Sequence, residues 1–369
     1  MNAQIPQASS STPLQQSEFL LVGCRHGSES ALEHRQKLAF PLFQKSYWRK
    51  GLVTFRIPSH IVSKPEWSHF GVPDNVLEQL VFARICIRSL GQITGPTEDE
   101  RIAATLRLLG SLKVDAVHVW KRDPRLQIDT ASIQRKINTL NSLRKKRIAS
   151  EPDLILNCVV DSVDRWWIGW HVGNAQTGQW SGGYYPGQMP PHGISRAWLK
   201  LDEAIARFGI HFQAGERVCE LGAAPGGACQ RLLEAHLRVV GVDPATMHPQ
   251  IAEHEQFTHW KKRARDVRIR DFGRFDWILT DMNIDPASTM ASLERILSSR
   301  PHKPRGIIAT LKLSDLSHAE ELDQWSSSCA SWGYQTRVQQ LSTGGQEICL
   351  VAQKKSTSRN ERMRFDQTS

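Results

Sequence analysis

Four ionisable side chains stand at the ends of predicted elements in the second half of the chain: Lys200, Asp281, Lys312 and Glu347. Lys200 lies in a helix-compatible stretch, Asp281 and Lys312 each end an apolar run typical of a strand, and Glu347 opens the last such run. A lysine that loses its proton can act as a general base, and a carboxylate can orient an ammonium group. Taken singly, each of the four could equally be a surface charge.

The predicted strands would bring two of these residues together. In a parallel sheet the carboxyl ends of the strands share one edge, and ligands bind there. Because Asp281 and Lys312 both stand at such ends, we expect them to face one crevice.

A glycine-rich turn, residues 221–227, leads from a predicted strand into a helix-compatible segment. Glycines permit a sharp turn close to a ligand, and the N-terminus of a helix offers unpaired N–H groups to an anion. Asp243 ends the next strand, where a carboxylate would accept hydrogen bonds from ribose hydroxyls. The spacing is not G-x-G-x-x-G, so it favours a nucleotide-like cofactor other than NAD. An ordinary tight turn is the alternative.

The elements around these residues predict an α/β fold. After Gly193, short and nearly continuous apolar runs alternate with helix-length segments, as in a doubly wound parallel sheet covered on both faces. Residues 335–341 and 348–352 should add an edge hairpin. The runs that should form the parallel strands are residues 218–221, 238–242, 275–280 and 306–311.

The first half predicts an α+β region. Strands are expected at 19–22, 52–57, 82–87 and 116–120, helices at 28–42, 98–109 and 133–148, and a hairpin from 154–160 and 165–172. The basic helix 133–148 could contact RNA or be a solvated face. The Trp and Tyr residues between 166 and 185 could stack on unpaired bases, but filling the core of a small sheet is the more ordinary use.

Length and composition suit a two-domain globular protein. The segment up to His192 is dense in Gly and Pro and predicts the boundary between the two domains. We expect a disordered tail (1–16), a first domain (17–190), a second domain (191–355) and a basic tail (356–369). A net charge of +10 suggests a polyanionic partner. We expect no membrane span, since no apolar run reaches about 18 residues.

The seven cysteines are scattered singly, without zinc-site spacing. They are typical of reduced core residues in a cytoplasmic protein, and we expect no metal.

Five segments, taken in order, resemble the FtsJ-like ribose 2′-O-methyltransferases, whose signature is a Lys-Asp-Lys-Glu tetrad. They are Ser-Arg-Ala-Trp-Leu-Lys-Leu-Asp-Glu (195–203), Leu-Gly-Ala-Ala-Pro-Gly-Gly (221–227), the strand ending in Asp281, Leu-Lys-Leu (311–313) and the late Glu347. The resemblance covers about residues 195–354. It implies a Rossmann-like domain that uses S-adenosylmethionine to methylate a ribose 2′-hydroxyl of RNA.

The overall layout further resembles a bacterial enzyme that methylates a cytidine ribose of large-subunit ribosomal RNA and carries an RNA-binding THUMP domain. That resemblance implies a THUMP-like region over residues 17–190 and a ribosomal RNA substrate.

The family resemblance assigns a role to each tetrad residue. Lys312 would be the general base for the 2′-hydroxyl, arranged by Lys200, Asp281 and Glu347. Desolvation and the nearby Lys200 cation would favour the neutral amine of Lys312. Asp281 acts in the opposite sense, so it would orient the ammonium and the positive end of the cofactor.

The resemblance also implies the cofactor contacts. The methionine part would lie on the turn, Gly222 with Ala224, Pro225, Gly226 and Gly227, the ribose on Asp243, and the adenine on Asp266, with Asp271 as its rival. Two positions depart from the family. Glu220 replaces an Asp and keeps the charge, and Ala228 replaces a Trp and removes an aromatic wall beside the cofactor.

Two other readings remain open on the sequence. The substrate could be tRNA or another RNA, or the chain could be an RNA-binding or assembly factor that keeps the fold without turnover. The tetrad argues against the second, because folding does not demand two lysines, an aspartate and a glutamate at these places.

Overall fold

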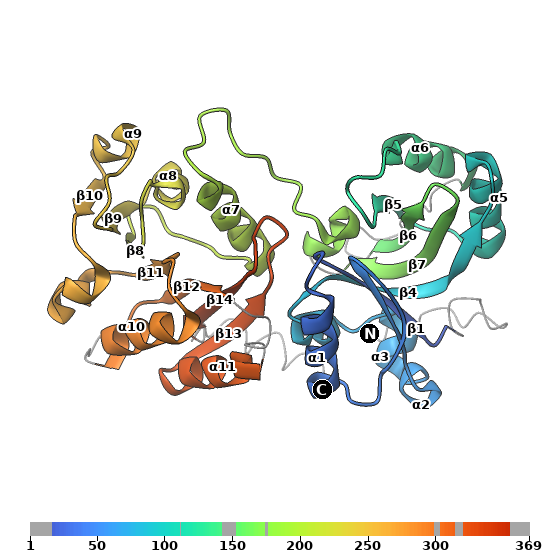
Figure 1. Ribbon diagram of the computed structural model, residues 1–369, viewed down its shortest axis with the longest axis horizontal. Coiled ribbons are helices and arrows are strands. Elements are labelled where there is room, and N and C mark those ends of the chain that lie inside the picture. Colours follow the sequence, from blue (N-terminus) through green and yellow to red (C-terminus); the bar gives the residue numbers. More distant parts are fainter. Residues whose placement is uncertain are drawn as a thin grey trace, which may run out of the picture. The chain divides into compact units, whose positions relative to one another are not determined.

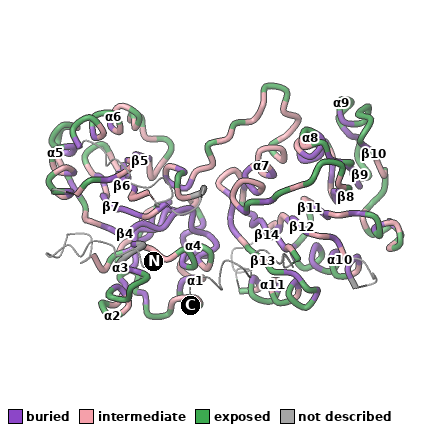
Figure 2. The backbone as a smooth tube through the Cα atoms, turned by 180° about the vertical axis from the view of Figure 1, so that it is seen from behind, coloured by how far each residue is buried: buried purple, intermediate pink, exposed green. Residues whose placement is uncertain are grey.

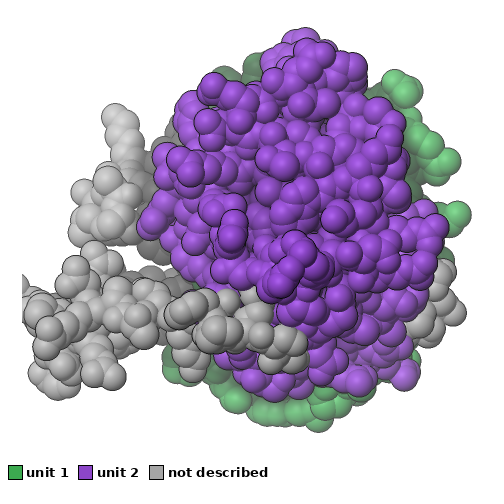
Figure 3. Space-filling model, turned by 90° about the vertical axis from the view of Figure 1, so that its left-hand side faces the viewer, with its two compact units in different colours: residues 1–186 green, residues 187–369 purple. Residues whose placement is uncertain are grey.

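The computed structural model describes residues 17–110, 112–141, 153–173, 176–298, 303–313 and 320–354. The chain divides into two compact units, residues 1–186 and 187–369, which Figure 3 shows in different colours. The division falls in the segment rich in Gly and Pro. Both expected tails and residues 142–148 of the basic stretch lie outside the described residues.

The N-terminal unit is built on a seven-stranded sheet in the order β2-β3-β1-β4-β7-β6-β5, in which only β5 and β6 are parallel neighbours. The strands are β1 (Phe19–Cys24), β2 (Gln44–Arg49), β3 (Leu52–Arg56), β4 (Ala83–Thr94), β5 (Ala116–Lys121), β6 (Asp153–Ser162) and β7 (Arg165–Gly173). The helices are α1 (Glu29–Ala39), α2 (Ser59–Val62), α3 (Pro65–Phe70), α4 (Asp74–Gln79), α5 (Glu98–Leu109) and α6 (Thr130–Asn141).

The predicted helix 98–109 and the predicted hairpin are confirmed. Thr97 and Glu100 form a capping box that starts α5, because each side chain accepts a hydrogen bond from the other's backbone N–H. Strand β2 was not predicted, since this edge strand is largely exposed and has no apolar face. Trp166 and Trp170 are buried, so they fill the core of the sheet.

The C-terminal unit is a Rossmann-like seven-stranded sheet in the order β10-β9-β8-β11-β12-β14-β13. Neighbours from β10 to β12 are parallel, and β14 is antiparallel to both β12 and β13. The strands are β8 (Arg217–Leu221), β9 (Arg238–Val242), β10 (Phe257–Trp260), β11 (Trp277–Thr280), β12 (Gly306–Lys312), β13 (Tyr334–Gln339) and β14 (Glu347–Lys354). The helices are α7 (Arg196–Phe208), α8 (Gly227–Glu234), α9 (Pro249–Ala252), α10 (Pro286–Ser298) and α11 (Leu322–Ser331).

Helices cover both faces of this sheet. Figure 1 shows α7 and α8 on one side and α10 and α11 on the other, and Figure 2 shows the central strands buried between them. The continuous apolar runs therefore form doubly covered strands, as predicted. The edge strand β10 was missed, because its four residues include the polar Thr258 and His259.

The described helices include none that is long and apolar enough to cross a lipid bilayer. All seven cysteines are buried and free, so none forms a disulfide.

Candidate active site

The register between β12 and β14 sets the first pair of the tetrad. Lys312 ends β12 and lies opposite Glu347, which begins β14. The Nζ atom of Lys312 donates a hydrogen bond to Oε2 of Glu347 at 2.6 Å. A slip of one residue would turn one of the two side chains to the other face of the sheet, so the register itself makes this contact possible.

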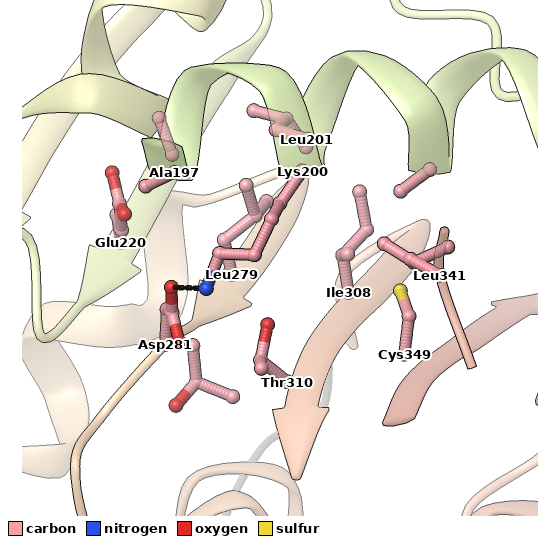
Figure 4. A pocket seen from close by; sticks show the side chains of 13 residues that line it. Ala197, Lys200, Leu201, Glu220, Leu279, Asp281, Ile308, Thr310, Leu341 and Cys349 are labelled. Carbon is pink, nitrogen blue, oxygen red and sulfur yellow. Dashed lines mark hydrogen bonds and ion pairs between the residues drawn. The ribbon is translucent and has the colours of Figure 1, made fainter. Parts of the chain in front are cut away.

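The other two residues close the group into a ring. Asp281 directly follows β11, the parallel neighbour of β12, and its Oδ1 lies 2.6 Å from Nζ of Lys312. Lys200 reaches from α7, and its Nζ donates to Oδ2 of Asp281 at 2.6 Å and lies 3.2 Å from Oε1 of Glu347. Figure 4 shows the Lys200 side chain pointing from the helix onto Asp281. Two cations and two anions thus alternate around a closed ring.

Helix α7 is held in place by Glu203, one turn after Lys200. Glu203 is fully buried, pairs with Arg207 at 2.8 Å, and accepts hydrogen bonds from the backbone N–H groups of Ser342 and Thr343. These contacts join the helix that carries Lys200 to the loop that leads into Glu347. Sequence reasoning gave Glu203 no role, although its spacing from Lys200 placed the two on neighbouring parts of one helix face.

The ring favours the charged forms of Asp281, Lys312 and Glu347. Burial by itself raises the pKa of the Asp281 and Glu347 carboxyls, but the nearby lysines outweigh it, so both pKa values are lowered. Burial by itself lowers the pKa of Lys312, but hydrogen bonds to Asp281 and Glu347 outweigh it, and the pKa is raised. The expectation that its surroundings favour a neutral Lys312 is therefore wrong for the protein without ligands, because it counted one carboxylate where two are in contact.

Glu220 lies behind the ring, in a small pocket that Ala228, Lys200 and Asp281 also line. Burial raises the pKa of Glu220 to about 8, although the Cys229 thiol donates a hydrogen bond to its Oε2 at 2.9 Å. The expectation that Glu220 keeps a negative charge is thus wrong near neutral pH, because the carboxyl is buried and no cation among the described residues forms an ion pair with it. Ala228 is buried.

We predict that Glu220→Gln changes how stability depends on pH. The raised pKa means that the folded protein holds a proton that the unfolded chain releases, so the wild type loses stability as pH rises from 4.5 to about 8. Because glutamine does not titrate, the variant should not lose this stability. The difference between its melting temperature and that of the wild type should therefore grow, in favour of the variant, as pH rises from 4.5 to about 8. Thermal denaturation at several pH values measures the difference. Glu255→Gln, at an exposed position, is the matched control, and equal pH slopes for Glu220→Gln and wild type would contradict the prediction.

The glycine-rich turn lies beside the ring, between β8 and α8. Gly222 and Gly226 have φ values of +81° and +117°, which favour glycine. A Cβ at Gly222 would lie 2.9 Å from Cα of Met282 and 3.0 Å from the carbonyl oxygen of Asp281. The backbone of the turn therefore approaches the Asp281 segment more closely than a side chain at Gly222 would allow. Helix α8 begins directly after the turn, so its first backbone N–H groups lie there too.

Asp243 stands at the carboxyl end of β9 and is tied to the turn. Its Oδ2 accepts a hydrogen bond from the backbone N–H of Ala224 at 3.1 Å, and its Oδ1 accepts one from that of Ala245 at 2.8 Å. Each carboxylate oxygen retains acceptor capacity for a ligand. The turn, the α8 N-terminus and Asp243 together fit a cofactor that carries both a carboxylate and a ribose.

We predict that Gly227→Ala damages the site. A Cβ there would overlap Oγ of Ser195 and lie 2.9 Å from the Ser195 carbonyl oxygen, at the start of the helix that carries Lys200. Overpacking of this kind costs about 1–3 kcal/mol, more than the ~0.5–1 kcal/mol that alanine gains over glycine in a helix. Cofactor affinity by calorimetry and the free energy of unfolding should both fall. Gly345→Ala, which adds its Cβ in open space, should change the free energy of unfolding much less, and equal effects would contradict the prediction.

The two candidates for the adenine contact differ in their surroundings. Asp271 is engaged by Arg268, whose Nε lies 2.9 Å from its carboxylate. Asp266 is exposed, and its nearest cation, Arg265, lies 3.9 Å away. Asp266 therefore has more acceptor capacity for a ligand. The described residues contain no group of three or more His, Cys, Asp or Glu side chains placed to hold a metal ion.

Comparison with known proteins finds a family match in the C-terminal unit. Residues 194–367 match the family model described as FtsJ-like methyltransferase. Among curated relatives, "Ribosomal RNA large subunit methyltransferase M" of Edwardsiella ictaluri is 33% identical over 37% of this chain and 37% of its own length. The protein of the same name from Halorhodospira halophila is 29% identical over 49% of this chain and 53% of its own length. The matched region thus spans about a third to a half of these relatives.

A solved structure, the fibrillarin pre-rRNA processing protein of Methanococcus jannaschii, aligns with 12% identity and a TM-score of 0.35. The alignment covers 57% of this chain and 84% of that one.

Proposed function

We propose that the chain, whose residues 194–367 match the FtsJ-like methyltransferase family, transfers a methyl group from S-adenosylmethionine to a ribose 2′-hydroxyl of RNA. The observation that supports this proposal most directly is the closed ring of side chains beside the glycine-rich turn. The ring consists of Lys200, Asp281, Lys312 and Glu347. The names of the relatives support a large-subunit ribosomal RNA as the substrate. A cytidine ribose as the target and action in the cytoplasm are part of the same proposal.

The residues of the turn would hold the cofactor. Gly222, the segment 224–227 and Asp243 would contact its methionine and ribose parts, and Asp266 its adenine. S-adenosylmethionine supplies an electrophilic methyl group on a positively charged sulfur. Bringing a hydroxyl and this group into near-attack geometry is itself a large part of catalysis, since orientation can contribute about 7–11 kcal/mol.

Lys312 is the proposed general base. Its Nζ would take the proton of the 2′-hydroxyl, while Asp281 and Glu347 fix the direction of the amine through the contacts of 2.6 Å. Lys200 holds the same two carboxylates from the other side. Because the side chain of Lys312 is 28% exposed, it can exchange protons with solvent between turnovers.

We also propose that the N-terminal unit, the expected THUMP-like region, supplies RNA affinity. Its basic helix α6 supports this only partly: Lys136 is paired with Glu98 and Asp99, whereas Arg135 is largely exposed and lies 3.9 Å from Asp129.

The function is tested by incubating the full-length protein with methyl-labelled S-adenosylmethionine and RNA. Unmodified large-subunit rRNA should gain label in a dinucleotide that resists alkaline hydrolysis, the mark of a 2′-O-methyl group, and tRNA should gain little. Label in tRNA alone would show that tRNA, and not rRNA, is the substrate. Binding of RNA without any transfer would leave an RNA-binding factor instead. Mapping ribose methylation in cells with and without the gene then identifies the nucleotide.

A further inference from the structure

Residues 261–274, here called the basic segment, concentrate positive charge on the surface of the C-terminal unit. Seven of its fourteen residues are Lys or Arg and two are Asp. All seven cations are exposed: Lys261, Lys262, Arg263, Arg265, Arg268, Arg270 and Arg274.

The backbone of the basic segment is anchored. Val267 and Phe272 are buried, and Arg295 of α10 donates a hydrogen bond to the carbonyl oxygen of Ala264 at 2.9 Å. Figure 1 shows the chain after β10 running toward α10, and Figure 3 is viewed from this side of the unit. The cations therefore form a surface that is fixed to the fold.

The basic segment starts at the same edge of the sheet as the tetrad. It follows β10, whose last residue, Trp260, accepts a hydrogen bond from the N–H of Asp243 at 3.3 Å. Four strand spacings separate β10 from β12, which at about 4.8 Å each puts the start of the segment roughly 19 Å from the end that carries Lys312. A polymer that lies along this edge could reach both.

Most of this positive charge is not neutralised by ion pairs among the residues that the structure describes. Arg268 pairs with Asp271, and its hydrogen bond lowers the pKa of that carboxyl, as do Arg270 and Lys262 at longer range. Asp266 lies 3.9 Å from Arg265. Within the described part of the chain, Lys261, Arg263 and Arg274 form no ion pair. An array of cations in such excess attracts a polyanion, because neutralised phosphates release their counterions.

We propose that the basic segment binds the sugar-phosphate backbone of the RNA substrate and directs the strand along the sheet edge toward Lys312. The inference rests on the proposed function, since it takes RNA as the substrate. Contacts of this kind set position and affinity and carry no sequence information. The segment therefore adds a binding surface in the catalytic unit itself, separate from any affinity of the N-terminal unit.

The test compares Lys261→Gln/Arg263→Gln/Arg270→Gln with wild type in the full-length protein. Binding of a fluorescein-labelled RNA hairpin is measured against salt concentration, with a second hairpin of unrelated sequence. Each lost phosphate contact should reduce the slope of log affinity against log salt by about one. Affinity for both hairpins should fall alike, and KM for unmodified large-subunit rRNA should rise with little change in kcat. For a single site, Arg263→Gln is compared with the matched control Arg238→Gln, which should leave RNA affinity near that of the wild type. Arg238 is exposed, but it lies at the opposite, amino end of β9.

The outcomes separate this proposal from the proposed function. Wild-type affinity and salt slope in the triple variant overturn it, as does a loss confined to S-adenosylmethionine affinity, which would assign the segment to the cofactor site. A loss of binding to anionic phospholipid vesicles with RNA binding intact also overturns it. If wild type binds RNA through the segment but transfers no methyl group, the surface stands and the proposed function fails. Equal melting temperatures show that the variant is folded.

Discussion

Replacing Lys312 by methionine should lower the rate of methyl transfer by about 10²- to 10⁴-fold, the usual contribution of a general acid or base. Methionine keeps most of the length of the side chain but cannot accept a proton. Cofactor affinity should change little, because the glycine-rich turn and Asp243 do not depend on Lys312 for any described hydrogen bond. Single-turnover transfer with labelled cofactor and unmodified large-subunit rRNA measures the rate, and calorimetry measures the binding.

The pH dependence gives this prediction its sharper form. Because its two carboxylate partners raise the pKa of Lys312 above the ordinary value, the neutral amine is scarce at neutral pH, and its fraction grows about tenfold per pH unit below the pKa. Wild-type kcat/KM, which reports the free enzyme, should therefore rise with pH, whereas the residual rate of Lys312→Met should not. Lys64→Met, at an exposed lysine, is the control. An undiminished rate in Lys312→Met would show that another group takes the proton.

Asp281→Asn should lower the transfer rate by at least about 10²-fold, because misplacement of a reacting group by about 1 Å can cost that much. Asp281 is the carboxylate that both lysines contact at 2.6 Å, so its loss leaves two cations with Glu347 alone. The same change removes a group that raises the pKa of Lys312. The pH profile of the residual activity should therefore shift to lower pH, and single-turnover rates across pH measure that shift.

This shift distinguishes a positioning role from simple damage to the fold, which would lower the rate at every pH alike. Glu347→Gln is the matched variant: it removes the other carboxylate partner of Lys312 and should shift the profile in the same direction. A profile that stays in place in both variants, with melting temperatures near wild type, would contradict the ring as the source of the raised pKa.

Local pattern was enough for most of the strands, whereas the four tetrad residues were singled out by the resemblance to the family. The apolar run ending in Asp281 and the one ending in Lys312 became β11 and β12, because doubly covered strands need apolar residues on both faces. The capping box of α5 set a helix start that sequence could place. Strands β2 and β10 lacked such a pattern, since one lies exposed at an edge and the other has only four residues.

The sequence by itself determined at which edge of the sheet Asp281 and Lys312 meet, because that follows from the periodicity of short segments. The resemblance of its motifs to the family singled out the four side chains of the proposed site. The tertiary structure alone decided that Lys312 stands opposite Glu347 and that Lys200 contacts both carboxylates. It also decided that Glu203 joins helix α7 to the loop that leads into Glu347. It also decided the charge states of Lys312 and Glu220. A pKa depends on burial and on charges nearby in space, and here those come from elements far apart along the chain.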